Sequence, residues 1–417
     1  MYRTYNARPL PRPLVHKRSH LLAFMLTSAV VLLAVGGYIG YALLRPLPPL
    51  QITLTPPVLP ALVTVNSPWP VEGQAAYGAD GYGLLAQKDS SKPEVPAPMA
   101  SVAKTITALA VLSKQPLSLG TTGPAILITQ ADVDIYKSYV ASDGSVVPVY
   151  AGETITQYQA LQALMLPSAN NIADTLAIWA FGSLQAYNQY ASSYVQALGM
   201  SHTTITDASG FASTTVSTAA DLVKLADKAL DNPVLVDIVS QKTAEFPEVG
   251  TIRNVNTLLG QSGIRGIKTG NTEAAGGCYL AIADILIGGK KISLITAVMG
   301  APSLAVAMQS SLPLIQSAPS QFQTVQAVRA GQIVGTAKTT WGAKSAIAAK
   351  TAINVTAWIG TAVAAKASPV LVTAPATAHT TAGQLSLNFN GTKQTTVVEL
   401  TAAVAKPKLW WRLSHPF

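Results

Sequence analysis

The chain has 417 residues, of which 11% are charged, against about 25% in average soluble proteins, and its mean hydropathy is +0.33. This composition is typical of a membrane protein or of an extracellular protein rich in Ala, Thr and Val. The formal net charge is +9, but five basic residues precede the first apolar run and no arginine-rich face follows it. We therefore expect no nucleic-acid partner. The single cysteine, Cys278, excludes an intrachain disulfide.

The first 44 residues combine a basic tail with a long apolar run. Residues 1–20 carry the five basic side chains and no acidic one, and residues 21–44 are long and apolar enough to cross a bilayer. The basic flank predicts a cytoplasmic N-terminus and an exported remainder. The segment after Tyr38 offers no small-x-small cleavage site, so we favour an uncleaved transmembrane anchor. A cleaved signal peptide is the alternative.

A proline-rich stretch separates this anchor from the next domain. Residues 45–68 hold repeated prolines, which predict a stiff, extended linker. Residues 69–316 are then predicted to form the next domain. It opens on a predicted β-hairpin over Gln74–Gln87, where Gly and Asp turn signals lie between short apolar runs.

The stretch from Pro98 to Leu112 predicts a helix, with Pro98 in its first turn and apolar residues at helical spacing. Ser101 and Lys104 are three residues apart, so their side chains project from one face. A serine hydroxyl becomes a nucleophile when a neighbouring base takes its proton, and a lysine with a lowered pKa can be that base.

Further apolar periodicity predicts a helical region followed by a sheet. Thr154 and Gln157 have capping-box spacing, and a tight turn over residues 168–171 separates two of the helices. The helices are expected over 158–166, 172–181, 184–198, 219–230 and 304–314, and the strands over 264–268, 278–287 and 291–298. Gly288 and Gly289 predict a two-residue hairpin turn. A boundary is expected over residues 317–323, before a small all-β domain over 324–417.

Three short motifs stand on these elements. Ser101-x-x-Lys104 starts a helix, Ser168-Ala-Asn170 lies on the inter-helix turn, and Lys268-Thr269-Gly270 ends a strand. Each alone also fits a simpler explanation, namely exposed helix positions, ordinary turn residues or a solvated strand end. Together, in this order and context, they match the motif set of penicillin-binding proteins and related β-lactamases.

The neighbouring residues resemble the serine D-alanyl-D-alanine carboxypeptidases, which are low-molecular-weight penicillin-binding proteins of peptidase family S11. The resemblance spans about residues 69 to 314 and includes the segments 166–174, 207–211, 254–259 and 266–278. It implies an α+β fold of the penicillin-binding/β-lactamase-like type, with an antiparallel sheet plus a helical subdomain. The sequence departs from the family at Asn171, where Asp is common, and its tail matches the family's C-terminal β domain only loosely.

The resemblance also implies roles for these residues. Ser101 would attack the penultimate D-Ala carbonyl of a peptidoglycan stem peptide ending in D-Ala-D-Ala, with Lys104 as the base. Lys268 lowers the pKa of Lys104 and, with Thr269, binds the terminal carboxylate. The remaining roles are substrate-amide binding by Asn170, proton relay by Ser168, close substrate approach at Gly270, and an oxyanion hole from the N–H groups of Ser101 and Asn271.

We therefore expect a penicillin-sensitive D,D-carboxypeptidase in the bacterial cell membrane, with its catalytic domain outside the cytoplasm and β-lactams as covalent inhibitors. It needs no cofactor and no metal, because its histidines lack metal-ligand spacing. His202 is expected at the surface and Cys278 inside a strand. The sequence also leaves open a D,D-endopeptidase acting on cross-links, a β-lactamase, and a catalytically silent wall-binding protein.

Overall fold

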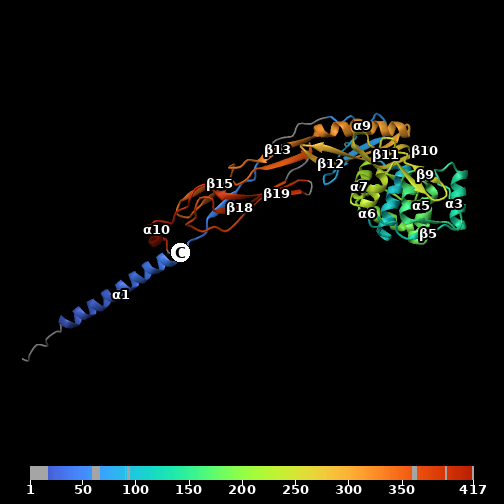
Figure 1. Cartoon of the computed structure of the whole chain (residues 1–417). Helices are drawn as coiled ribbons and strands as arrows, with labels where there is room; N and C mark the ends of the chain where they lie inside the picture. Colours follow the sequence, from blue (N-terminus) through green and yellow to red (C-terminus); the bar gives the residue numbers. More distant parts are fainter. Residues whose placement is uncertain are drawn as a thin grey trace, which may run out of the picture.

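The molecule is elongated, with a long helix at one end, a β-rich domain in the middle and a mixed unit of helices and sheet at the other end (Figure 1). The structure is a computed structural model that describes residues 17–58, 66–89, 91, 94–358, 364–389 and 392–415. Most of the basic tail expected over residues 1–20 therefore lies outside the described residues.

The N-terminal helix α1 spans Lys17–Leu44. Its segment His20–Leu44 is long and apolar enough to cross a membrane, and its large apolar side chains are exposed. Membrane anchors and signal sequences share this length and composition.

A five-stranded antiparallel sheet organises the mixed unit, which we call the catalytic unit. Its order is β10-β11-β12-β2-β3. The strands are β2 Gln74–Ala79, β3 Gly83–Gln87, β10 Ile264–Thr272, β11 Gly276–Ile287 and β12 Lys290–Ala301. Gly288 and Gly289 join β11 to β12 with φ values of 56° and 81°, which suits a tight hairpin turn. The predicted hairpins β2–β3 and β11–β12 are both confirmed.

Alternate residues of the sheet enter two separate cores. Ala76 packs among the helices that precede the sheet in sequence, whereas Ala75 and Tyr77 face a second core with helix α9, Leu304–Gln321. The other helices are α2 Lys104–Lys114, α3 Gln130–Ala141, α4 Gln157–Met165, α5 Asn170–Phe181, α6 Leu184–Ala197, α7 Ala219–Leu230 and α8 Pro233–Ser240. The predicted α+β class is therefore confirmed.

Short two-stranded pairs and single 3₁₀ turns complete the unit. They are β4 Ala97–Pro98 with β7 Val216–Ser217, β5 Ala125–Leu127 with β6 Thr154–Thr156, β8 Thr243–Phe246 with β9 Gly250–Arg253, and the turns η1 Ala100–Ala103 and η2 Gln261–Gly263.

Two local predictions were wrong. Pro98 does not lie in the first turn of a helix, because it pairs with Val216 in the β4–β7 ribbon. The capping box before α4 uses Thr156 and Gln159 instead of Thr154 and Gln157. The Thr-x-x-Gln pattern occurs twice in overlapping registers, and Thr154 is held in β6 by its pairing with Leu127.

The expected boundary over 317–323 is also part of regular structure. Helix α9 continues to Gln321 because Leu314, Ile315 and Ala318 are buried in the core behind the sheet. Strand β13 follows directly at Phe322.

The C-terminal region is a β domain, built on a six-stranded sheet of order β1-β14-β15-β19-β18-β17 beside the pair β13–β16. Its elements are β13 Phe322–Val328, β14 Ile333–Lys338, β15 Lys344–Ala349, β16 Ile353–Trp358, β17 Ala364–Pro369, β18 Thr381–Phe389, β19 Thr392–Leu400 and the short helix α10 Leu409–Ser414. The edge strand β1, Gln51–Leu54, comes from the predicted linker over 45–68, so this segment contributes more than a spacer.

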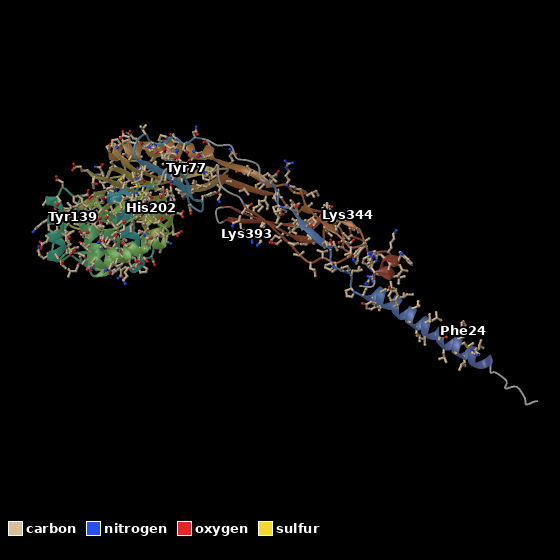
Figure 2. The ribbon with its side chains drawn as sticks, turned by 180° about the vertical axis from the view of Figure 1, so that it is seen from behind. Phe24, Tyr77, Tyr139, His202, Lys344 and Lys393 are labelled. Atoms are coloured by element: carbon tan, nitrogen blue, oxygen red, sulfur yellow. The ribbon has the colours of Figure 1, made fainter. Side chains whose placement is uncertain are left out.

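An aromatic cluster joins the β domain to the catalytic unit. Trp358 lies with its ring centroid 4.9 Å from that of Tyr77 and 5.1 Å from that of Phe322. Figure 2 labels Tyr77 at the side of the catalytic unit that meets the β domain. These contacts tie β13 and β16 to the sheet that carries the candidate site.

Candidate active site

Ser101 lies on the 3₁₀ turn η1, just before α2. In such a turn residues three apart are nearly eclipsed, so the side chains of Ser101 and Lys104 leave the backbone in the same direction. The preceding residue, Ala100, has a φ of 48°, a left-handed conformation that costs free energy in any residue with a Cβ. Ser101 is partly exposed, whereas Lys104 is fully buried.

The Lys104 ammonium donates three hydrogen bonds. Its Nζ lies 2.8 Å from Ser101 Oγ, 2.6 Å from Asn170 Oδ1 and 2.8 Å from the carbonyl oxygen of Ser209. These contacts hold Nζ against the serine hydroxyl, from which a neutral amine at the same place could accept a proton.

Electrostatics favour that neutral amine. Burial, and after it the cation of Lys268, holds the pKa of Lys104 well below its ordinary value, against the opposing charges of Asp207 and Asp174. Burial also lowers the pKa of Lys268 to about 7. Two lysines in one dry region therefore carry less positive charge at neutral pH than two lysines in water.

Strand β10 brings Lys268, Thr269 and Gly270 beside η1. Lys268 and Thr269 are buried, and Lys268 Nζ donates to the Thr269 carbonyl oxygen at 3.0 Å. A Cβ built at Gly270 would lie 3.0 Å from both Ser101 N and Ala100 Cβ. Gly270 thus lets β10 approach the backbone of Ser101. The absence of a side chain at this position is explained by that backbone contact, and not by the close approach of substrate that the sequence predicted.

The turn between α4 and α5 forms the third side of the site. Ser168 has a φ of 70°, and its buried Oγ has no hydrogen-bond partner within the described residues. Asn170 begins α5, and its Oδ1 accepts from Lys104. Asn271, expected to supply an oxyanion-hole N–H, is exposed near the end of β10.

Sequence reasoning missed a polar network beside Lys104. Tyr139 of α3 donates to Asp174 Oδ2 at 3.0 Å, and its hydroxyl lies 3.3 Å from Ser209 Oγ. Ser209 Oγ in turn donates to Asp207 Oδ2 at 2.7 Å. Burial raises the pKa of Asp174 to about 6. The segment 207–211 belonged to the resemblance, but its contact with Lys104 runs through a backbone oxygen, for which side-chain patterns give no signal.

Asn171, the departure from the family pattern, has a structural partner. Its Nδ2 donates to the Val147 carbonyl oxygen at 2.8 Å, and its Oδ1 accepts from Val147 N–H at 3.1 Å. An amide satisfies both the backbone N–H and the backbone carbonyl of Val147, whereas an ionised Asp could only accept. Asn171 therefore holds the loop around Val147 against the start of α5, where the Asn170 N–H also donates to the Ser145 carbonyl oxygen at 2.7 Å.

His202 and Cys278 lie away from these contacts. His202 is exposed and pairs with Glu94 at 3.1 Å. Cys278 is fully buried in β11, and burial raises the pKa of its thiol to about 11. Across the part of the chain that the structure describes, no group of three or more His, Cys, Asp or Glu side chains could hold a metal ion.

A sequence profile of D-alanyl-D-alanine carboxypeptidases, peptidase S11, matches residues 83–303 and so covers Ser101, Asn170 and Lys268. The chain belongs to the peptidase S11 family.

Individual relatives support the S11 assignment. A D-alanyl-D-alanine carboxypeptidase of Mycobacterium tuberculosis is 32% identical over 212 residues, which are 49% of this chain and 67% of the relative. A D-alanyl-D-alanine endopeptidase of Pseudomonas aeruginosa is 27% identical over 216 residues, which are 48% of this chain and 66% of the relative. The matches thus span about half to two thirds of the length of the curated relatives.

Solved structures confirm the fold. Penicillin-binding protein 5 of Haemophilus influenzae superposes with a TM-score of 0.58 at 20% identity, covering 82% of this chain and 100% of that one. The Streptomyces K15 DD-transpeptidase gives a TM-score of 0.53 at 25% identity, covering 60% of this chain and 98% of that one. The predicted penicillin-binding fold is therefore correct.

Proposed function

We propose that this chain is a penicillin-sensitive serine D,D-carboxypeptidase, which removes the terminal D-Ala from peptidoglycan stem peptides. The observation that carries the proposal is the contact of buried Lys104 Nζ with Ser101 Oγ at 2.8 Å, beside a strand that carries Lys268. Membership of the S11 family supports the substrate class.

In the acylation step, neutral Lys104 accepts the Ser101 hydroxyl proton while Oγ bonds to the carbonyl carbon of the penultimate D-Ala. The backbone N–H groups of Ser101 and Asn271 stabilise the resulting oxyanion. The C–N bond to the last D-Ala then breaks, and the proton held by Lys104 passes through Ser168 to the departing amine.

Substrate binding uses the same strand. Lys268 and Thr269 receive the terminal carboxylate through charge-assisted hydrogen bonds, and Asn170 Nδ2 binds the amide of the stem peptide. Water then attacks the acyl-enzyme, which releases the shortened stem and returns the proton to Ser101. A β-lactam carries a reactive amide and a carboxylate, so it acylates Ser101 in the same way.

Helix α1 is the proposed membrane anchor, with the N-terminus in the cytoplasm and the catalytic unit outside it. The length and apolar surface of His20–Leu44 support this placement. N-terminal sequencing of the membrane-extracted protein tests it: an intact α1 is expected, and a new N-terminus after residue 44 would identify a cleaved signal peptide.

An endopeptidase acting on peptide cross-links is the second candidate, because relatives with that name match this chain at 27% identity. The two activities separate when D-Ala release from a pentapeptide is compared with cleavage of a cross-linked dimer. Release from the pentapeptide, abolished by Ser101→Ala, is the expected result. Cleavage of the dimer alone would favour the endopeptidase.

Fluorescent penicillin distinguishes a carboxypeptidase from a β-lactamase and from a catalytically silent protein. Stable labelling that Ser101→Ala abolishes is expected. Rapid turnover of the label would indicate a β-lactamase. No labelling and no release of D-Ala would indicate a catalytically silent protein.

A further inference from the structure

Charge is divided unevenly between the two regions of the molecule. Residues 324–417 contain nine Lys or Arg residues and a single acidic residue, Glu399, whereas residues 69–316 contain thirteen basic and eighteen acidic residues. Glu399 is paired with Lys350 at 2.8 Å. The β domain is therefore a strongly basic segment between α1 and the catalytic unit.

Five of these nine cations, together with Arg45, gather where the β domain meets the end of α1. We call them the cation collar: Arg45, Lys338, Lys344, Lys406, Lys408 and Arg412. Lys338 and Lys344 face each other across the β14–β15 hairpin. None of the six has an acidic partner among the residues that the structure describes.

Aromatic contacts connect the hairpin to α10. Trp341, in the turn of that hairpin, lies with its ring centroid 5.4 Å from that of Trp411. Trp341 Nε1 also donates to the carbonyl oxygen of Ala405 at 3.1 Å, next to Lys406. The hairpin, the 405–408 segment and α10 thus form one continuous surface.

Helix α10 is docked on the C-terminal end of α1. Arg412 donates to the carbonyl oxygens of Ala42, at 3.1 Å, and of Leu43, which satisfies acceptors that a helix end leaves open. Arg45 lies over the Trp411 ring, 6.0 Å from its centroid. Figure 1 shows α10 beside the end of α1 that faces the β domain.

The outer face of α10 is apolar and uncovered. Trp410 is 78% exposed and Leu409 is 55% exposed. Two cavities flank Trp411. One, of about 350 Å³, is lined by Trp341, Lys406 and Lys408, and the other, of about 530 Å³, has Arg45 and His415 in its lining. Exposed tryptophan beside hydrated cations suits the headgroup level of a bilayer, where one side of a surface is apolar and the other is charged.

We propose that the cation collar and α10 bind the headgroups of anionic phospholipids in the leaflet where α1 ends. This inference rests on the proposed membrane insertion of α1. A bilayer is favoured over a soluble polyanion for two reasons. The collar adjoins the apolar helix α1, and α10 beside it exposes Trp410 and Leu409, which a water-soluble polymer would leave in contact with water. Binding at a second point beside α1 fixes the direction in which the β domain projects the catalytic unit.

The test uses the full chain in lipid nanodiscs of phosphatidylcholine with increasing fractions of phosphatidylglycerol. Quenching of tryptophan fluorescence by headgroup-spin-labelled lipid reports contact with the headgroup layer. Quenching is expected to rise with phosphatidylglycerol and to fall in high salt, and Trp410→Ser should remove most of the rise. In Lys406→Gln/Lys408→Gln the association constant for phosphatidylglycerol is expected to fall about 30-fold.

The matched control is Lys366→Gln/Lys393→Gln, which removes the same charge elsewhere on the β domain. Lys366 and Lys393 are exposed, and they lie on the two strands that flank β18, opposite Ser386 and Asn388. Figure 2 places Lys393 toward the catalytic unit and Lys344 toward α1. The control should leave the phosphatidylglycerol dependence unchanged.

Three results would overturn the proposal. They are quenching that is independent of phosphatidylglycerol, an equal effect of both lysine pairs, and displacement of the lipid by soluble polyphosphate at equal charge. Failure of the chain to enter nanodiscs would instead refute the anchor, and penicillin labelling, measured on the same samples, reports the active site separately.

Discussion

The catalytic unit and the β domain place lysine in opposite environments. Lys104 and Lys268 are buried among backbone and amide oxygens, and burial lowers the pKa of both ammonium groups. Lys406 and Lys408 are exposed, and neither forms an ion pair with an acidic residue among the described residues. Lys104 can lose its proton and act as a base beside the Lys268 cation. Lys406 and Lys408, in contrast, stay exposed to water and attract anions at long range. One residue type thus supports two functions through its solvation.

The largest effect is expected when the buried base is removed. Lys104→Met keeps an apolar side chain of similar length but cannot accept the Ser101 proton, so acylation by penicillin should slow by about a thousandfold. Stopped-flow labelling measures the rate. Lys114→Gln, which removes an exposed lysine from the same helix, should leave it unchanged. A Lys104→Met rate within a few-fold of the parent would refute the role of this lysine as the base.

The next effect tests the contact that places strand β10 beside Ser101. In Gly270→Ala the added Cβ would lie 3.0 Å from Ser101 N, so β10 or η1 must move by a few tenths of an ångström. Misplacement of this kind should lower the acylation rate by up to about a hundredfold. The thermal unfolding midpoint should fall as well. An unchanged rate would mean that the site tolerates a wider separation between Lys268 and Ser101.

A substitution at Asn171 tests how strongly the stability of the fold depends on the hydrogen bonds of this buried amide. Asn171→Asp leaves the Val147 carbonyl without its donor and puts a carboxylate in a fully buried position. The free energy of unfolding at pH 7 should drop by about 1–3 kcal/mol, as measured by urea denaturation. The loss should shrink at pH 4, where a protonated Asp can donate again. A loss of stability, relative to the parent protein, that is the same at pH 4 and at pH 7 would argue against this explanation.

The smallest effect concerns Asp174, whose negative charge raises the pKa of Lys104. Asp174→Asn removes this charge, so the pKa of Lys104 should fall further and the acidic limb of the acylation profile should move to lower pH. At pH 6 the gain in rate should be about two- to threefold. Asp134→Asn, on the exposed face of α3, is the control. A shift of the limb to higher pH would contradict the sign of this interaction.

The sequence predicted those parts of the site that depend on local spacing. Ser101 and Lys104 share one helical turn, and Gly288 and Gly289 suit a hairpin turn whatever surrounds them. The turn that holds Ser168 lies between two helices with strong apolar periodicity. Such features are set by neighbours along the chain, so a pattern in the sequence reveals them.

The remaining features depend on contacts between distant segments. Tyr139 is 35 residues from Asp174, and the Ser209 acceptor is a backbone oxygen, which every residue carries. Strand β1 forms because Gln51 meets Lys338 at the edge of a sheet, and no local signal in a proline-rich stretch predicts that partner. The predicted domain boundaries stay predictions, and the variants above test the predicted catalytic roles.

The role of Ser101 as nucleophile is tested most directly by the mass of the peptide that carries it after reaction with benzylpenicillin at pH 7. We predict that this peptide gains the mass of one penicilloyl group, that the gain is lost in Ser101→Ala, and that it forms slowly in Lys104→Met. An adduct on any other residue, or full labelling of Ser101→Ala, would contradict this role.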